Sequence, residues 1–509
     1  MHRGRSCDPS GRTPSLRPRA GAWTWAVPLV ATLLLCGRPG GARAETSDAA
    51  LPLGQVVERV ACLSDPQQTY ALFLPSTYRA DRLWPILYAF DPAARGPVPT
   101  RLFSVAAERL GYIVVGSNNS RNGPWPPVAA AIEAIWQDTH ARFALDPERV
   151  YATGMSGGTG PAAVLATNHG AGAIVCAGAV QASHVSGADG RFTWIGIAGD
   201  ADFNLDWTKT LVETLATRGV VARFATFEGG HGWPPEDLAA RALSWLELGA
   251  MRSGRRPRDA EFIAAQLDQS QARVRDLVAR GQLDAAADEN ATLARELAGL
   301  APVVAFEAEA RRLAATPEAV AARKREKART DKDRQQSSQL LALRSRLEQA
   351  AGGGSARPAE SPRELSDLVE AGNAAAAARD ELDRLIAKLG RDVNSSDPET
   401  RLLARRVLNG FYVSTFETGR SRRESRELDA ARADFELCAQ MRPKTAPPIY
   451  ELARNYAARG DKKKAFAELR KAASLGFSDA SRLTEDPEWK TLASQPEFAA
   501  IVEELRARR

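Results

Sequence analysis

The sequence predicts an α/β domain with a mostly parallel sheet over residues 50–250, followed by an all-α helical-repeat region. Three observations predict this division. Between about residues 67 and 250, short apolar runs alternate with amphipathic runs at the spacing of strands joined by crossover helices. After Gly249 the strand-like runs end, and Ala, Leu, Arg and Glu dominate the rest of the chain. A chain of 509 residues also exceeds what one hydrophobic core normally supports.

Residues 1–44 have the order of a secretory signal peptide. Five arginines lie in the first twenty residues, an apolar stretch covers residues 22–35, and Ala42-Arg43-Ala44 follows. The apolar stretch is shorter than the roughly 20 residues that cross a bilayer, so we predict cleavage after Ala44 rather than a retained anchor. Lipoprotein processing at Cys36 is an alternative, although Leu35 is bulkier than the small residue that usually precedes such a cysteine. The expected location is periplasmic or secreted.

Removal of this segment changes what the charge implies. The chain has 68 basic and 62 acidic residues, a net charge of +6, and residues 1–44 alone hold seven arginines against one aspartate. The mature chain is therefore formally neutral, which removes the basic charge as an argument for nucleic acid or an anionic membrane. We expect no nucleic-acid partner and no integral membrane segment after cleavage. The remaining cysteines, Cys62, Cys176 and Cys438, are too few for a disulfide scaffold, and a Cys62–Cys176 bridge stays open.

The predicted strands are short, and several are apolar throughout, as expected for a parallel sheet covered on both faces. Amphipathic helical patterns lie between them, including 127–142, with a proline at its start, and 236–248. The predicted strands cover residues 69–74, 86–90, 112–116, 150–153, 172–180, 193–199 and 223–227.

The second half divides at a segment rich in glycine and proline. Residues 255–350 form a predicted helical region, with amphipathic helices over 262–314 and a highly charged continuation at 323–334. Residues 351–362 form a predicted flexible linker. In residues 363–509, the run 449–456, the Gly460-Asp461 turn and the run 465–472 together resemble a tetratricopeptide repeat. One clear repeat is not an array, so the other helices are expected to cap or complete it.

The clearest chemical motif is Gly154-Met155-Ser156-Gly157-Gly158, which matches G-x-S-x-G. In a nucleophile elbow the serine lies in a strained turn between a strand and a helix, and the flanking positions need glycine to avoid collisions. The motif alone is common, but here a predicted strand precedes it and a helical pattern follows it. Ser156 is therefore the predicted nucleophile.

The order of residues along the chain supplies the partners. Of the four histidines in the mature chain, His231 follows the last predicted strand, where a triad histidine is expected in this arrangement. The strand at 193–199 leads to Asp200 and Asp202. We predict Asp202 as the acid, because its position beyond the strand end lets its side chain reach back to His231. Asp200 is the alternative, and the acid that does not serve is expected to bind turn amides.

These segments carry a family resemblance. Residues 146–151, the elbow at 154–158, the turn at 199–202 and the run 230–235 together resemble the α/β-hydrolases of the polyhydroxybutyrate-depolymerase, feruloyl-esterase and dienelactone-hydrolase-like group. The resemblance covers only residues from about 50 to 250, and the helical half shares none of it. It implies a serine nucleophile activated by a histidine that an aspartate orients, roles that fall on Ser156, His231 and Asp202.

One segment departs from that group. Many relatives have His-Gly after the third strand, whereas this chain has Phe90-Asp91-Pro92-Ala93. Pro92 has no amide hydrogen to donate. The backbone amide of Gly157 is the expected first donor of an oxyanion hole, and that of Asp91 the second, with Ala93 as the alternative. An acidic side chain near the hole opposes a developing negative charge unless it turns away, so catalytic strength is in question more than fold.

The sequence thus predicts an exported serine hydrolase, an esterase that acts on a small or polymeric acyl substrate through an acyl-enzyme, with a helical module for a protein partner or the substrate. A serine peptidase of the same fold is one alternative, because both enzymes use the same triad. A non-catalytic scaffold built on a retired hydrolase domain is another; intact Ser156 and His231 oppose it, and Asp91-Pro92 favours it. The sequence contains no metal-ligand cluster, phosphate loop or dinucleotide fingerprint, so we expect no cofactor and no metal.

Overall fold

The computed structural model describes residues 51–185, 189–353 and 362–507. The predicted signal segment and most of the predicted linker lie outside these ranges. The residues from Pro52 onward belong to one unit of the fold.

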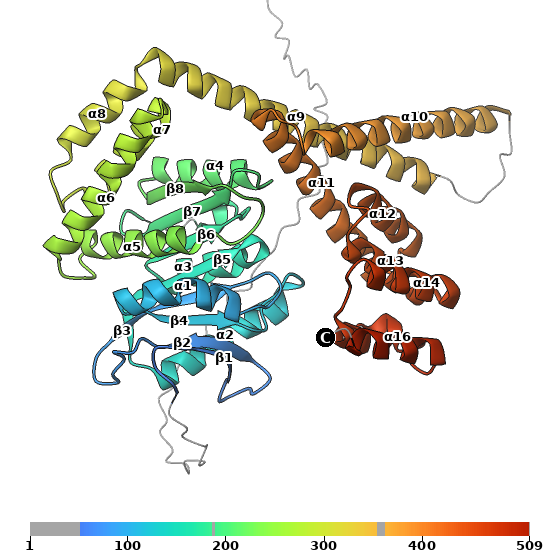
Figure 1. The fold of residues 1–509 in the computed structure, drawn as a ribbon, viewed down its shortest axis with the longest axis horizontal. Coiled ribbons are helices and arrows are strands. Elements are labelled where there is room, and N and C mark those ends of the chain that lie inside the picture. The colour runs from blue at the N-terminus through green and yellow to red at the C-terminus, as the bar shows by residue number, and fades with distance from the viewer. Residues whose placement is uncertain (1–50, 186–188, 354–361, 508–509) are drawn as a thin grey trace, which may run out of the picture. The chain divides into compact units, whose positions relative to one another are not determined.

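Within the described residues, eight strands form one sheet in the order β1-β2-β4-β3-β5-β6-β7-β8 (Figure 1). The β1–β2 and β2–β4 pairs are antiparallel, and all other neighbours are parallel. The strands are β1 (Val56–Ala61), β2 (Thr69–Phe73), β3 (Trp84–Phe90), β4 (Ile113–Ser117), β5 (Leu145–Met155), β6 (Gly172–Cys176), β7 (Thr193–Gly199) and β8 (Val221–Phe227).

Each predicted strand is present, and β7 has the predicted bounds. Strand β6 ends before the predicted residue 180, because Ala177 adopts a positive φ of 55° that breaks the extended backbone. The sequence missed β1, whose burial pattern is mixed: Val60 is buried while Glu58 and Arg59 are exposed. Such a strand at the edge of a sheet lacks the continuous apolar run by which the central strands were recognised.

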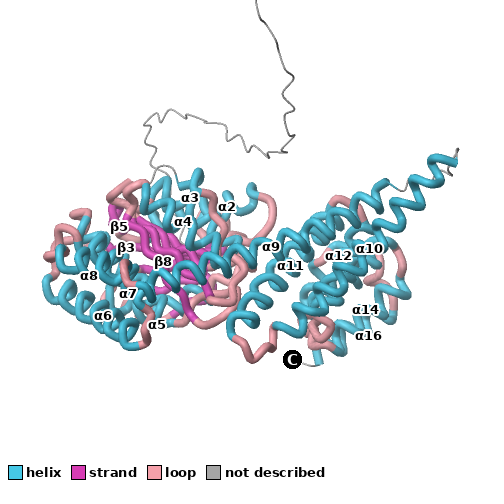
Figure 2. Tube along the Cα trace, turned by 90° about the horizontal axis from the view of Figure 1, so that it is seen from above, coloured by secondary structure: helices cyan, strands magenta, loops and turns pink. Residues whose placement is uncertain are grey.

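Helices cover both faces of this sheet. Figure 2 shows α2, α3 and α4 on one side of the magenta strands and α5 on the other, and α1 packs against α5. The parallel strands are apolar throughout because both faces are buried, as β3 and β7 show. These helices are α1 (Pro97–Leu110), α2 (Trp125–Arg142), α3 (Thr159–His169), α4 (Leu205–Thr217) and α5 (Glu236–Arg252).

The rest of the described chain is helical, as predicted. Helix α9 is the longest; it packs against α7 and α8 and also against α10 and α11. The helices are α6 (Ala260–Ala279), α7 (Leu283–Leu297), α8 (Val304–Ala314), α9 (Pro317–Gly353), α10 (Pro362–Asp392), α11 (Pro398–Glu424), α12 (Leu428–Met441), α13 (Ala446–Arg459), α14 (Lys462–Ser474), α15 (Ala480–Glu485) and α16 (Pro496–Ala507). Helices α13 and α14 meet at Gly460, whose φ is 79°, but their tetratricopeptide character stays a prediction.

Helices α6 and α7 share the hydrophobic core of the sheet domain. Ile263, Leu293 and Leu297 lie in the same buried cluster as side chains of β6, β7 and α5. A buried ionic group adds to this contact: Arg223 of β8, only 4% exposed, pairs with Glu296 at 2.6 Å and with Glu289 at 2.9 Å, both from α7. A buried arginine requires such counter-charges, so β8 and α7 depend on each other.

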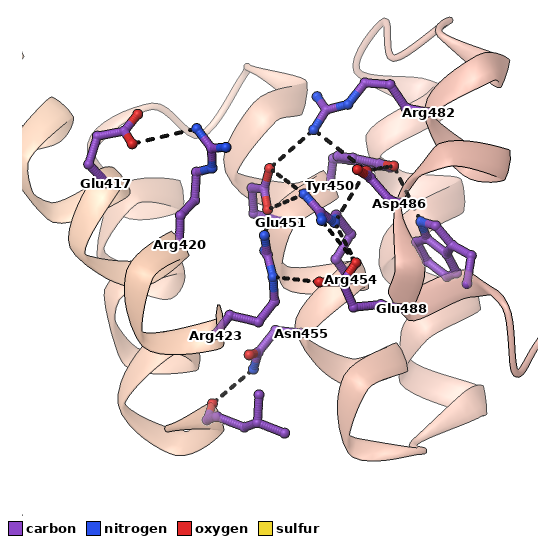
Figure 3. A network of polar contacts seen from close by, with 12 residues as sticks. Glu417, Arg420, Arg423, Tyr450, Glu451, Arg454, Asn455, Arg482, Asp486 and Glu488 are labelled. Carbon is purple, nitrogen blue, oxygen red and sulfur yellow. Dashed lines mark hydrogen bonds and ion pairs between the residues drawn. The ribbon is translucent and has the colours of Figure 1, made fainter. Parts of the chain in front are cut away.

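A second buried ionic network joins the last helices (Figure 3). Arg423 of α11 pairs with Glu451 of α13, and both side chains are almost fully buried. Arg423 also reaches Glu488 at 3.0 Å, and Arg454 pairs with Glu488 at 2.9 Å. Tyr450 donates a hydrogen bond of 2.6 Å to Asp486. The network connects α11 and α13 with the segment that follows α15.

The three described cysteines are buried and free, so the Cys62–Cys176 bridge that the sequence left open does not form. Burial raises the pKa of the Cys62 thiol to about 12, which keeps it protonated and unreactive at neutral pH. No helix in the described ranges combines the length and apolar character needed to span a bilayer.

Candidate active site

Ser156 lies at the sharp turn between β5 and α3. Its φ is 53°, a left-handed conformation that costs free energy for any residue with a side chain. Two glycines allow the turn to close: a Cβ on Gly154 would lie 2.0 Å from the carbonyl oxygen of Gly158, and one on Gly158 would lie 2.0 Å from that of Phe90. The turn therefore has the strained strand-to-helix geometry of a nucleophile elbow.

His231 and Asp202 lie in the loops after β8 and β7, which are neighbours in the sheet. The Asp202 carboxylate is fully buried, and its Oδ1 lies 3.0 Å from His231 Nδ1. Because an ionised carboxylate can only accept, this contact places a hydrogen on Nδ1; in the neutral imidazole, Nε2 is then the atom with the free lone pair. The backbone N–H of Asn204 also donates to Asp202 Oδ1 at 2.8 Å, which fixes the carboxylate. The arrangement is that of a base oriented by an acid.

Three features decide the fold. They are the mostly parallel sheet, the elbow after β5, and the order in which the loops with Asp202 and His231 follow along the chain. This is an α/β-hydrolase fold. The first half of the chain forms this fold and carries the candidate site. The helical half lies outside the α/β-hydrolase fold.

The two candidate acids have different partners. The Asp200 carboxylate accepts a hydrogen bond of 3.0 Å from the amide of Gly229 and, within the described residues, makes none with His231. It therefore binds a turn amide, as the sequence suggested for the acid not chosen. The Asp200 amide also donates to the Phe227 carbonyl at 2.9 Å, so Asp200 joins the β7 loop to the β8 loop.

Ser156 and His231 are not hydrogen-bonded to each other in the part of the chain that the structure describes. The Ser156 carbonyl accepts a hydrogen bond of 2.6 Å from Thr159. His231 is 20% exposed, and the ring of Phe203 stacks on it with 4.3 Å between centroids. Catalytic hydrogen bonds are often long without substrate and shorten in the reacting complex. The structure thus joins the acid and the histidine by a hydrogen bond, while among the described residues none links Ser156 to His231.

The Asp91 carboxylate is fully engaged elsewhere. Its Oδ1 accepts from the Ala93 amide and from Arg95, and its Oδ2 from Arg95 and from the Trp233 indole, all at 2.9 Å. Burial raises the pKa of Asp91, but these hydrogen bonds outweigh burial and hold it below its ordinary value. The negative charge is thereby compensated. The Ala93 amide is therefore already used as a donor to this carboxylate.

Sequence reasoning missed Asn122, which lies directly beside the elbow. A Cβ on Gly157 would fall 1.7 Å from Asn122 Oδ1, so a larger residue after Ser156 would require the Asn122 side chain to move. The backbone N–H of Asn122 donates to the Pro92 carbonyl at 2.8 Å, which ties the loop of Asn122 to the segment that holds Asp91. A cavity of about 300 Å³ opens here, lined by Asp91, Asn122, Trp125 and Gly157 among others. No motif marks Asn122, because it reaches the site through the packing of two loops.

The comparisons with solved structures cover only part of this chain. The structure resembles a ferulic acid esterase (17% identity, TM-score 0.31, covering 37% of this chain and 94% of the other). It also resembles an esterase of Pyrobaculum calidifontis (14%, 0.32, 40% and 87%) and a fluorophosphonate-binding serine hydrolase of Staphylococcus aureus (14%, 0.33, 38% and 99%). No protein-family model and no curated protein matches the sequence. Among the described residues, no three His, Cys, Asp or Glu side chains gather as a metal site.

Proposed function

We propose that this protein is an exported serine hydrolase that cleaves carboxylic esters with Ser156, His231 and Asp202. The observation that carries the proposal is the 3.0 Å contact between His231 Nδ1 and the buried Asp202 carboxylate, in a chain whose G-x-S-x-G serine lies in a strained elbow. A buried aspartate that accepts a hydrogen bond from the histidine after the last strand favours the tautomer that a general base needs. The substrate is a small or polymeric acyl ester.

The reaction has two halves. In the first, Ser156 Oγ attacks the ester carbonyl carbon while His231 Nε2 takes its proton; the tetrahedral intermediate then expels the alcohol, which receives that proton. In the second, His231 activates a water molecule that attacks the acyl-serine, and the acid leaves as Ser156 regains its proton. The amides of Gly157 and Asp91 are the proposed donors to the oxyanion. Asp202 stays ionised and stabilises the imidazolium.

Labelling of the mature chain with a fluorophosphonate probe tests the nucleophile and base. Such a probe phosphonylates an activated serine with loss of fluoride, so Ser156→Ala and His231→Ala should each abolish labelling. Asp202→Asn should slow labelling on the order of 10³- to 10⁴-fold, because the wrong tautomer is then favoured. Asp200→Asn tests the alternative acid: its side-chain oxygen still accepts from Gly229, so labelling should fall far less than in Asp202→Asn.

Each outcome separates the alternatives. A folded wild-type protein that stays unlabelled would support the scaffold alternative, in which the helical half carries the function. If labelling requires Ser156, a comparison of nitrophenyl acyl esters with peptide anilides distinguishes an esterase from a peptidase. Equal effects of Asp200→Asn and Asp202→Asn would contradict the assignment of the acid.

Export is the second part of the proposal, and it rests on residues 1–44. Expression of the whole chain in a bacterium with a periplasm should yield a periplasmic protein whose first residue is Glu45, as read by N-terminal sequencing. A lipid-modified Cys36 at the new N-terminus would support the lipoprotein alternative instead. An unprocessed chain in the cytoplasm would contradict export. The helical half is the proposed surface for a protein partner or the substrate.

A further inference from the structure

The loop that carries Asp202 is held from outside the hydrolase half. It runs from the end of β7 to the start of α4, and side chains of α9 and α11 contact it at both ends. At its start, Arg406 of α11 donates a hydrogen bond of 2.7 Å to the Asp200 carbonyl. Just past its end, in the first turn of α4, Arg334 of α9 donates to the Asp206 carboxylate at 2.9 Å, in a partly exposed pair. Asp202 lies between these two points of attachment.

Arg406 is itself fixed in place. Its Nε donates to the Asp333 carboxylate of α9 at 2.6 Å, and its side chain is only 13% exposed. Its Nη1 is thereby aimed at the Asp200 carbonyl, two residues before Asp202. Asp200 in turn binds the Gly229 amide, two residues before His231. Hydrogen bonds thus connect α9 and α11 with Asp200 and Gly229, each of which lies two residues from a member of the acid–histidine pair.

A second contact reaches the histidine directly. The Phe203 ring stacks on His231, and Gly410 of α11 packs close to the same Phe203 side chain. A Cβ on Gly410 would lie 3.0 Å from Phe203 Cβ, closer than side chains normally approach. Glycine at this position lets α11 pack closely against Phe203, the residue that stacks on His231.

We propose that Arg406 is a positioning residue for the hydrolase reaction, and that Arg406 and Gly410 make the helical half part of the catalytic apparatus. This inference rests on the proposed function. Arg406 touches no reacting atom. It acts through the Asp200 carbonyl, and Gly410 acts through Phe203, to hold Asp202 and His231 in the geometry that activates Ser156. Since small misplacements of catalytic groups lower rates strongly, their loss should appear in the rate of serine activation.

The test measures the second-order rate of fluorophosphonate labelling and the melting temperature of the full mature chain. Arg406→Ala should slow labelling about tenfold. Arg406→Lys should label at a rate between those of the wild type and Arg406→Ala. A single ammonium group cannot bond both Asp333 and the Asp200 carbonyl in the way that the forked guanidinium does. Arg405→Ala is the matched control: Arg405 is the neighbouring arginine on α11, exposed, and bonded to the Val393 carbonyl within the helical half. It should label at the wild-type rate.

Gly410→Ala separates positioning from stability. Alanine favours a helix more than glycine does, so a merely structural role predicts an unchanged or raised melting temperature and an unchanged labelling rate. We expect slower labelling without loss of folding, because the added methyl group displaces Phe203 from His231. Gly390→Ala in α10, where a Cβ would meet nothing within 4 Å, is its control.

The outcomes are distinct. Slower labelling in Arg406→Ala and Gly410→Ala, with both controls unchanged, supports the proposal. Wild-type labelling in folded Arg406→Ala and Gly410→Ala variants overturns it, as does equal slowing by Arg405→Ala. If Arg406→Ala does not fold, Arg406→Lys and Gly410→Ala distinguish these two outcomes in the same way. Absence of Ser156-dependent labelling in the wild type would instead refute the proposed function, so the two failures are distinguishable.

Discussion

Four hydrogen bonds hold the Asp91 carboxylate beside the elbow, and they come from Ala93, Arg95 and Trp233. The carboxylate is fully buried, whereas Arg95 is half exposed. A buried acid with this many donors stabilises the loop after β3, where an oxyanion donor is proposed. The acidic residue that distinguishes this chain from the hydrolases it resembles is therefore a structural anchor with its charge compensated.

Asp91→Asn should lower the free energy of unfolding by about 1–3 kcal/mol, since Arg95 loses its ionised partner and the amide cannot accept all four bonds. Urea unfolding at pH 7 measures this. The depressed pKa of Asp91 gives the sign of the pH dependence: the contribution is complete above the ordinary pKa of about 4 and is lost as the pH falls through the folded value. The difference between variant and wild type should thus shrink below about pH 4.

The control for this prediction is Asp81→Asn. Asp81 pairs with Arg79 on the surface, where both side chains are more than half exposed, and such pairs contribute little. A loss for Asp81→Asn as large as that for Asp91→Asn would show that the effect does not come from the buried hydrogen bonds.

Single residues were predictable from sequence where chain order constrained them. Ser156, Asp202 and His231 each follow a strand that an apolar run reveals, and the structure joins two of them, Asp202 and His231, by a hydrogen bond. The sequence favoured Asp202 over Asp200; the structure gives the contact with His231 to Asp202, and the role of the acid stays a proposal. Asn122 and Arg406 were not predictable, because each reaches the site through contacts between distant segments. In sequence, Arg406 cannot be told from Arg405.

At the scale of elements, the network of Figure 3 ties α11 to α13 through buried charges. Glu451 of α13 is at its centre, and it contacts Arg423, Arg454 and Arg482. Burial raises the pKa of Glu451, but the arginines, Arg423 foremost, outweigh burial and lower it. Glu451 therefore stays ionised well below neutral pH, and its ion pairs with the arginines persist at that pH.

Glu451→Gln should destabilise the chain by about 3–5 kcal/mol, because it leaves the buried Arg423 without its main counter-charge. Thermal unfolding followed by circular dichroism in the far ultraviolet checks this. Because the folded pKa is depressed, the stabilisation is present above the ordinary pKa of about 4 and fades as the pH falls below it.

Glu503→Gln in α16 is the comparison for this variant. Glu503 pairs with Arg506 in a mostly exposed position, and its loss should cost less than about 1 kcal/mol. If Glu451→Gln were as mild as Glu503→Gln, the network would contribute no more to stability than a surface pair.

For the whole molecule, sequence patterns predicted the division into a sheet-bearing half and a helical half, since a change in periodicity is visible without any tertiary contact. What they could not show is how the halves share interiors. Ile263, Leu293 and Leu297 carry ordinary amphipathic spacing, and nothing in that spacing says that they enter the core beside α5. The partner of an apolar helix face is decided by packing, which a single sequence does not record.

The burial of Arg223 has a consequence for the order in which the chain acquires structure during synthesis. Strand β8 is complete long before its counter-charge exists, because Glu296 follows Arg223 by 73 residues. A chain that emerges with its N-terminus first therefore leaves this arginine without its counter-charge until α7 has emerged. We expect β8, and with it the loop bearing His231, to become fixed after the elbow on β5.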